Sequence, residues 1–220
     1  MKEFENIKPD VNNKTYERGI FGSRPNLEAR IINDNDKLRQ STEALRALGL
    51  EIVLTSGTFD LVHIGHAKYL EEAKKYGDIL IVGVDSDEKV RRRKGPERPV
   101  VPEEERIQML ANLRSVDVII VKQPDEAKWG LIKLVQPDTL VVTRETYNEE
   151  DLDKLREFCG QIVILEPQAT TSTSAQIRRL QVGWSSKIRE PIEEILKEHN
   201  ADVELCRKIG NILLGRNNEQ

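Results

Sequence analysis

Residues 51–66 read EIVLTSGTFDLVHIGH, and this stretch gives the clearest indication of the architecture. Its first five residues form a short, mostly apolar run bounded by Ser56 and Gly57, which predicts a buried strand. A helix is predicted over residues 65–76, because Gly77 follows it as a stop signal. A buried strand that turns at a glycine into a helix is typical of an α/β fold.

The same alternation continues towards the C-terminus. Four more apolar runs predict strands, and the segments between them predict helices. The strands are predicted at residues 78–84, 116–121, 139–143 and 161–165, and the helices at residues 102–113, 125–135, 149–158 and 174–180. Five strands that alternate with helices imply a doubly wound, mostly parallel five-stranded sheet with helices on both faces. Such sheets bind ligands at the carboxyl ends of their strands.

The two ends of the chain are predicted to add further elements. Residues 1–33 are rich in Asn, Lys and Glu and are expected to form a loosely ordered arm, whereas residues 34–48 predict an amphipathic helix. Residues 187–214 predict two more helices. We therefore divide the chain into an N-terminal arm and helix (1–49), a central α/β domain (50–182) and a C-terminal helical extension (183–220).

Composition and charge restrict the classes of function. The 220-residue chain has a net charge of −4, so nothing in its overall charge favours nucleic-acid binding. No apolar run approaches the ~20 residues that span a bilayer, and the acidic start MKEFENIKPD lacks the apolar core of a secretory signal. Cys159 and Cys206 form no CxxC pair, which fits a reducing compartment. We expect a cytoplasmic protein that binds neither nucleic acid nor membrane.

Two histidines follow the first predicted strand. His63 and His66 are three residues apart at the entrance of a helix, so they are expected to reach one ligand together. Gly57 lets the backbone approach that ligand, and the helix start offers N–H groups and the positive end of a dipole. Two imidazoles there can donate to phosphate oxygens and stabilise the charge of a leaving pyrophosphate. A structural role and a metal site are the alternatives, but no third metal ligand lies nearby and the surroundings favour phosphate.

Residues 57–66, GTFDLVHIGH, resemble the GxFDxxHxGH signature of the cytidylyltransferase-like nucleotidyltransferase superfamily, with the HxGH element complete. The likeness runs over residues 50–180 and identifies the central segment, 50–182, as a Rossmann-like nucleotidyltransferase domain. It implies that a phosphate oxygen of the acceptor attacks the α-phosphorus of a nucleoside triphosphate in line, with Mg²⁺ or another divalent cation bridging the phosphates. The resemblance implies catalytic roles for His63 and His66. It implies nucleotide contacts by Gly57, Thr58, Phe59 and Gly65.

A cluster of cations follows the second predicted strand. Residues 91–106 contain RRRKGPERPV and then PEEER, which resembles the KGxxRPV…ER segment of bacterial heptose 1-phosphate adenylyltransferases. From the residues alone, it is a loop with five cations within residues 91–98, either a solvated surface or a site that neutralises a triphosphate. The resemblance implies a catalytic role for Lys94 and phosphate binding by Arg106. It leaves Arg98 either to hold the loop or to contact the acceptor substrate.

Three further places carry candidate residues. Residues 171–177, TSTSAQI, resemble the STTxII signature of the superfamily, so Ser172, Thr173 and Ser174 are predicted to bind nucleotide phosphate, although they would also serve as an ordinary N-cap. Asp85, at the end of the second strand, is a candidate substrate ligand or turn residue. Arg144 follows the fourth strand and either binds a phosphate or carboxylate of the acceptor or forms a surface ion pair.

The resemblance to the heptose-type enzymes over residues 50–122 indicates ATP and a sugar 1-phosphate, such as heptose 1-phosphate, as substrates. Residues 142–147 read VTRETY where those enzymes carry a KGGDY-like segment, so other substrates stay open. The alternatives are CTP-dependent transfer to glycerol phosphate, a phospho-alcohol or a phosphonate, and adenylylation of FMN. A non-catalytic nucleotide-binding regulatory module is the alternative from another class. The superfamily commonly forms dimers, so we expect a homodimer.

Overall fold

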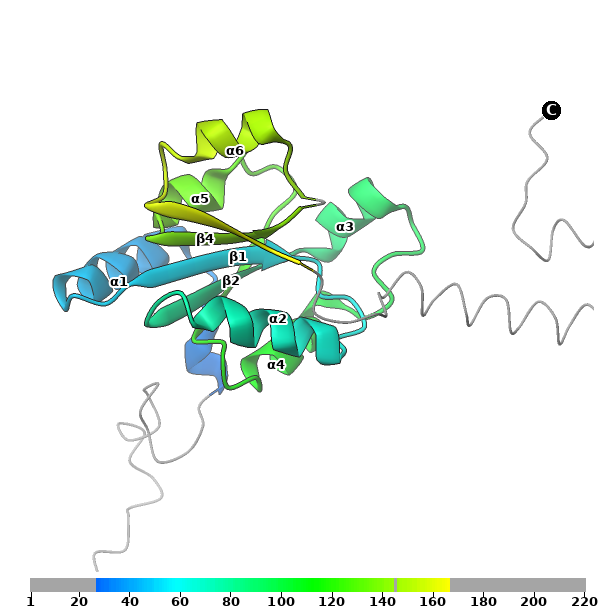
Figure 1. Ribbon diagram of the computed structural model, residues 1–220. Helices are drawn as coiled ribbons and strands as arrows, with labels where there is room; N and C mark the ends of the chain where they lie inside the picture. The colour runs from blue at the N-terminus through cyan, green and yellow to red at the C-terminus, as the bar shows by residue number, and fades with distance from the viewer. Residues whose placement is uncertain (1–26, 145, 167–220) are drawn as a thin grey trace, which may run out of the picture. The chain divides into compact units, whose positions relative to one another are not determined.

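The computed structural model describes residues 27–144 and 146–166, which form one α/β unit (Figure 1). Its five strands pair in parallel in the order β3-β2-β1-β4-β5. The strands are β1 (Ile52–Gly57), β2 (Ile79–Asp85), β3 (Val118–Lys122), β4 (Thr139–Thr143) and β5 (Gln161–Leu165). The predicted five-stranded parallel sheet is therefore confirmed.

Helices cover both faces of the sheet (Figure 1). One face carries α1 (Asn35–Ala47), α5 (Gly130–Val135) and α6 (Glu149–Leu155), and the other carries α2 (Ile64–Lys74) and α4 (Glu103–Ala111). Consecutive residues of β1 point to opposite faces, so Val53 joins the core beneath α2 and α4, while Ile52 and Leu54 join the core beneath α1 and α5. Burial on both faces explains why the strands read as continuous apolar runs.

The strand order reverses between β1 and β4. Strand β1 pairs with β2 along its whole length on one side and with β4 at Val53 and Leu54 on the other. Ligands of open parallel sheets bind beyond the carboxyl ends of the strands at such a reversal. The segment that leaves β1, residues 58–66, enters this position directly and continues into α2.

Two helix predictions are corrected. Residues 91–94 were expected in a loop, but they form the last turn of α3 (Asp87–Lys94), which Ser86 caps by accepting from the N–H of Lys89. Val90 is the one buried side chain of α3, so the sequence shows no apolar period there. The helix predicted over residues 125–135 begins only at Gly130, because Trp129 has a left-handed backbone with φ of 62°.

The end of the predicted arm is also corrected. Residues 27–33 were expected to be loosely ordered, but Leu27–Arg30 form a short 3-10 helix and Ile31 forms a parallel bridge with Ile119 of β3. The guanidinium of Arg30 donates to the carbonyls of Ala111, Leu113 and Val116 at 2.9–3.2 Å. Residues 1–26 and the C-terminal helices predicted after residue 166 lie outside the described residues. None of the described helices is long and apolar enough to cross a bilayer.

Candidate functional site

The turn after β1 has an unusual backbone. Phe59 and Leu61 both adopt left-handed conformations, with φ of 51° and 48°. Such conformations cost about 1–3 kcal/mol each for residues other than glycine and persist where the surroundings impose them. The ring of Phe59 is buried in the core, and a Cβ at Gly57 would approach this ring to 3.1 Å. A side chain at position 57 would therefore force the Phe59 ring to shift.

Asp60 fastens this turn to a second segment. Its buried carboxylate accepts from the backbone N–H groups of Val100 and Val101 at 3.0–3.1 Å and from Nε of Arg98 at 2.8 Å. Burial by itself would raise the pKa of Asp60, but the two N–H groups and the Arg98 guanidinium outweigh it and lower the pKa. Arg98 thus contacts the loop that it was predicted to hold, and its alternative contact with the acceptor stays a prediction.

The two histidines cap α2 reciprocally. Nδ1 of His63, the N-cap residue, accepts from the N–H of Gly65 at 3.0 Å, and Nδ1 of His66 accepts from the N–H of His63 at 3.3 Å. A neutral imidazole has one acceptor and one donor nitrogen, so acceptance at Nδ1 leaves the proton on Nε2 in both rings. The ring centroids are 4.1 Å apart. The cap thus provides two neighbouring Nε2–H donors.

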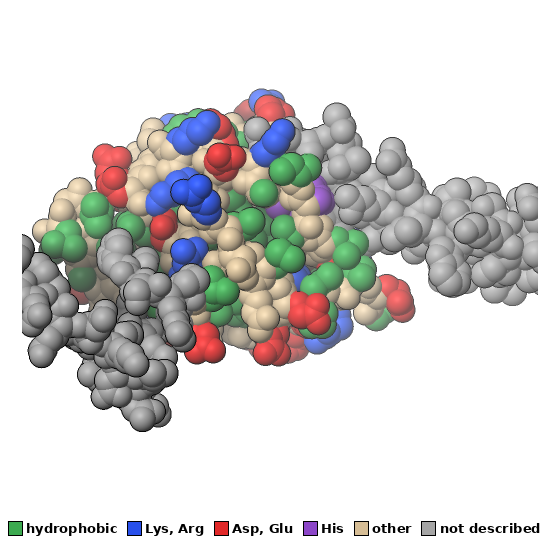
Figure 2. Space-filling view, turned by 90° about the horizontal axis from the view of Figure 1, so that it is seen from below, with side chains coloured by type: hydrophobic (Ala, Val, Ile, Leu, Met, Phe, Trp, Pro, Cys, Tyr) green, Lys and Arg blue, Asp and Glu red, His purple; other side chains and the backbone are tan. Residues whose placement is uncertain are grey.

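This arrangement changes one expectation. The helix start was expected to offer free backbone N–H groups to an anion, but the N–H of Gly65 is already bonded to His63. The imidazole Nε2–H groups, rather than that backbone group, are available to a ligand. Both rings are half-buried, and Figure 2 shows histidine surface exposed in the described part of the molecule.

His66 is held in its neutral form. Burial, followed by electrostatic interactions with His63 and Lys94, lowers the pKa of His66 from 6.5 to about 4, against a smaller opposite effect of Asp60. Protonation at Nδ1 would also remove the acceptor for the His63 N–H. Phe59 contributes to the apolar side of this environment, because its ring meets that of His66 edge-on at 5.6 Å.

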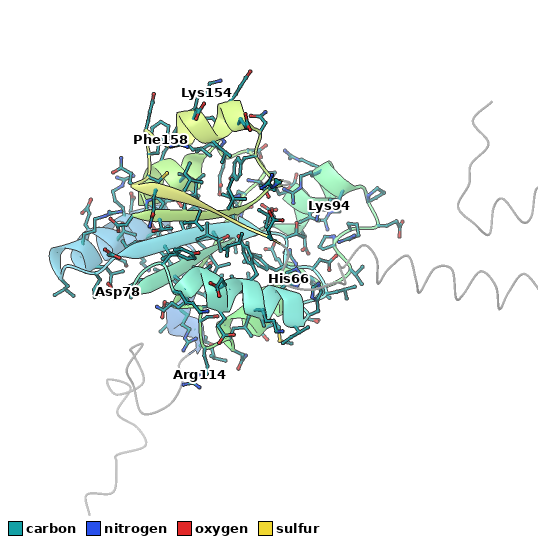
Figure 3. All side chains as sticks on the ribbon, viewed as in Figure 1. His66, Asp78, Lys94, Arg114, Lys154 and Phe158 are labelled. Atoms are coloured by element: carbon teal, nitrogen blue, oxygen red, sulfur yellow. The ribbon has the colours of Figure 1, made fainter. Side chains whose placement is uncertain are left out.

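Lys94 ends α3 at the same end of the sheet as His66 (Figure 3). By contrast, the labelled Asp78 lies at the amino end of β2 (Figure 3). Among the described residues, Lys94 forms no hydrogen bond and no ion pair, which leaves its ammonium group available. Partial desolvation and the charges of Arg93 and Arg98 lower its pKa. The position of Lys94 and the positive charge of its ammonium group together suit the binding of a phosphate.

A buried carboxylate joins α3 to the turn after β1. Oδ2 of Asp85 accepts from Arg93 at 2.8 Å, and Arg93 also donates to the hydroxyl of Thr58 at 2.7 Å. Oδ1 of Asp85 lies 3.6 Å from Nζ of Lys122. Burial lowers the pKa of Lys122, which the Asp85 carboxylate opposes. Asp85, predicted as a substrate ligand, thus lies at the centre of a polar cluster that also contains Arg93, Lys122 and Thr58.

Arg106 is placed differently from what we expected. Its fully buried guanidinium donates to the carbonyls of Val101, Thr58 and Asp85 and to the carboxylate of Asp87. A direct contact with phosphate would require it to give up some of these bonds in the interior, which is costly. In this geometry Arg106 holds three segments of the site together, and its predicted contact with phosphate stays a prediction.

The remaining predicted residues lie at the edge of the site or outside it. Arg144, in the turn after β4, is exposed, and its Nε lies 3.4 Å from Glu166. Its predicted contact with the acceptor stays a prediction. Ser172, Thr173 and Ser174 lie outside the described residues, so their predicted phosphate contacts also stay predictions.

The described part of the chain contains no cluster of typical metal ligands. No group of three or more His, Cys, Asp or Glu side chains gathers there. The two buried carboxylates of the site, Asp60 and Asp85, already hold Arg98 and Arg93. Mg²⁺ commonly keeps several waters and binds through substrate phosphates, so an ion that arrives with the triphosphate needs no such cluster.

Two residues of this site were missed by sequence reasoning. Arg93 was counted only within a run of cations, and Lys122 was not singled out. Their positions at the ends of α3 and β3 were the available signal, because the carboxyl ends of β2 and β3 meet at one edge. Without the fold, nothing in the sequence pairs either residue with Asp85.

The parallel sheet, the reversal of strand order at β1 and the histidine-capped helix define a domain of the nucleotidyltransferase class. The profile of the cytidylyltransferase-like family matches residues 54–192. The chain belongs to this family, as its GTFDLVHIGH segment indicated.

Similar proteins agree with this assignment. Bifunctional protein HldE of Nitratiruptor sp. is 36% identical over 166 residues, which are 76% of this chain and 35% of that protein. Bifunctional protein HldE of Aliarcobacter butzleri is 35% identical over 168 residues, which are 76% of this chain and 34% of that protein. The chain spans about a third of the length of these relatives. The crystal structure of pantoate-beta-alanine ligase from Francisella tularensis, 17% identical, has a TM-score of 0.53 over 83% of this chain and 85% of that one, a likeness of fold alone.

Proposed function

We propose that this domain transfers a nucleoside monophosphate from ATP to a phosphorylated small molecule, a sugar 1-phosphate such as heptose 1-phosphate, and releases pyrophosphate. The observation that carries the proposal is the reciprocal cap of His63 and His66, which leaves two Nε2–H donors side by side. Lys94 adds a cation at the same end of the sheet (Figure 3). Hydrogen-bond donors and a cation together can stabilise the negative charge that develops as the bond between the α-phosphate and the leaving pyrophosphate breaks.

The proposed reaction is one in-line displacement. An oxygen of the acceptor phosphate forms a bond to the α-phosphorus of ATP, and the bond from this phosphorus to the oxygen that bridges to the β-phosphorus breaks. The Nε2–H groups stabilise the charge on the oxygens of the α-phosphoryl group, and Lys94 stabilises the departing pyrophosphate. Neither His nor Lys forms a covalent intermediate, so the contribution of the protein is positioning and fixed charge.

The choice of ATP and a sugar phosphate rests on the likeness of residues 91–106 to the heptose-type segment and on the HldE relatives. Cytidylyl transfer to glycerol phosphate, a phospho-alcohol or a phosphonate, and adenylyl transfer to FMN, are outcomes of the same test. The homodimer, the cytoplasmic location and the division at residues 49 and 182 stay predictions from the sequence.

A pyrophosphate-release screen tests the proposal. Purified protein is incubated with ATP or CTP, with each class of acceptor, and with Mg²⁺ or EDTA. We expect pyrophosphate release that requires ATP and a sugar 1-phosphate together. A matched His66→Ala protein serves as the control and is expected to be inactive. Release with another pair would reassign the substrates. Nucleotide binding without release from any pair would favour the regulatory module and refute the enzyme.

A further inference from the structure

A cavity lies at the carboxyl ends of β1 and β3. Its volume is about 280 Å³, near the lower end of ligand pockets. Its lining includes Ser56 of β1 and Lys122 of β3, together with Trp129 and Tyr147. Ser56 and Lys122 come from the carboxyl ends of their strands, the edge at which His63 follows β1. The cavity and the histidine pair therefore lie at the same edge of the sheet.

Lys122 lines the cavity, and its ammonium group faces a buried carboxylate, that of Asp85, which is not itself part of the cavity lining. Oδ1 of Asp85 is buried and has no hydrogen-bond partner, although the other oxygen of this carboxylate is bound by Arg93. The ammonium of Lys122 lies 3.6 Å from Oδ1, too far for a hydrogen bond, and it donates to no other described residue. Buried polar groups nearly always have a partner, so an unmatched acceptor and donor beside a cavity point to a ligand.

The backbone makes room for Lys122. A Cβ at Gly83 of β2 would lie 2.9 Å from Cδ of Lys122, 2.7 Å from Oγ of Ser56 and 2.6 Å from Leu131. The absence of a side chain at Gly83 thus lets the stem of Lys122 cross the strand and bring the ammonium towards Asp85. The pair is a packed arrangement rather than a chance contact between surface side chains.

We propose that Asp85 and Lys122 together bind a hydroxyl group of the acceptor, such as one hydroxyl of a sugar phosphate. A hydroxyl can donate to Oδ1 of Asp85 and accept from Nζ of Lys122 at the same time. A carboxylate of the ligand would be repelled by the negative charge of Asp85, and an amine of the ligand would be repelled by the positive charge of Lys122. The inference rests on the proposed function, since it assigns the acceptor of the same reaction.

The kinetic test uses Lys122→Met, which keeps the stem over Gly83, and Asp85→Asn, which keeps the shape of the carboxylate. Each is expected to raise the KM for the sugar phosphate roughly 10- to 100-fold, because a hydrogen bond to a charged group is lost. Lys122→Met is also expected to leave the KM for ATP nearly unchanged, whereas Asp85→Asn also disturbs Arg93 beside Thr58 and is compared on the acceptor alone. Lys133→Met, an exposed lysine on α5, is the matched control. Circular dichroism verifies that each variant is folded.

Deoxy analogues of the acceptor sharpen this test. Wild-type protein is expected to disfavour one deoxy position by about 100-fold or more in kcat/KM, since a site built for a hydroxyl is left unpaired without it. Lys122→Met should lose most of this discrimination. Equal discrimination in wild type and Lys122→Met would overturn the assignment.

A binding measurement separates this inference from the proposed function. In a Trp184→Phe background, Trp129 in the cavity wall is the remaining tryptophan, and its emission reports sugar phosphate binding without turnover. Saturable binding that Lys122→Met weakens supports the inference even where no pyrophosphate is released, an outcome that would refute the transferase alone. No binding, or binding unchanged by Lys122→Met, overturns the inference even where pyrophosphate is released.

Discussion

The backbone N–H of His63 donates to Nδ1 of His66 at 3.3 Å, while Nδ1 of His63 accepts from Gly65 at 3.0 Å. Each ring therefore uses one nitrogen to cap the helix and keeps the other, Nε2, for a ligand. The cap that fixes the start of α2 also fixes the tautomer and direction of the two donors. Structure and proposed chemistry thus depend on the same hydrogen bonds.

Replacement of His63 separates the cap from the donor. In His63→Asn the amide oxygen can still accept from Gly65, so stability should change little, whereas His63→Ala should also lose about 0.5–2 kcal/mol of stability with the cap. Both variants should lose roughly 100- to 1000-fold in kcat, because a positioned donor to the transition state is gone. Steady-state pyrophosphate release and thermal unfolding measure the two effects. Wild-type kcat in His63→Asn would rule out the role as donor.

The lowered pKa of His66 predicts a pH dependence of stability. The pKa of His66 is about 4 in the folded protein and 6.5 without the fold, so between these values the unfolded chain binds a proton that the folded protein does not. Its contribution is fully present above pH 6.5 and is lost as the pH falls towards 4. Urea unfolding of wild type and His66→Asn over this range should show a difference that changes with pH. A constant difference would contradict the low pKa.

Lys94→Ala should lower kcat/KM for the triphosphate by roughly 10- to 100-fold, since a charge-assisted contact to phosphate is lost. Its stability should stay close to that of wild type, because Lys94 forms no hydrogen bond with another described residue. Arg91→Ala, an exposed cation of the same helix, is the matched control for net charge. Equal nucleotide kinetics in the two variants would show that only the net charge matters.

Arg106 should affect stability more than nucleotide affinity. Arg106→Met leaves the partly exposed carboxylate of Asp87 and three carbonyls without their donor, which is expected to cost about 1–3 kcal/mol of unfolding free energy for each carbonyl that stays buried and unpaired. Arg106→Lys should restore little, because an ammonium cannot reach acceptors spread over the planar fork. Chemical denaturation checks this. An Arg106→Lys protein of normal stability with a raised KM for ATP would instead support the role of phosphate ligand.

The sheet and the histidine pair could be predicted because their signals are local. Strand β1 is a continuous apolar run, and His63 and His66 lie within one turn of the helix that follows it. Helix α3 could not be predicted in this way, since Val90 alone is buried and its capping by Ser86 resembles an ordinary turn. The spacing of apolar residues cannot reveal a helix that is anchored by a single buried side chain.

The contacts that hold the site together were also beyond local reasoning. Arg106 belongs to the segment that resembles a phosphate-binding motif. Its hydrogen-bond partners Thr58 and Asp85, however, lie 48 and 21 residues away in the chain. Likewise, Arg30 anchors the end of the supposed arm to carbonyls more than 80 residues distant. Such long-range bonds depend on the fold and leave no period or motif in the sequence.

In the proposed reaction, the Nε2–H groups of His63 and His66 contact the triphosphate. Long-range 1H–15N spectra of a His199→Gln protein, which retains only these two histidines, report the tautomer of each ring and its response to ATP. We expect both rings to be protonated at Nε2, and both Nε2 resonances to shift in a saturable way as ATP is added. Protonation at Nδ1 in either ring, or Nε2 resonances that ATP leaves unmoved, would contradict the account.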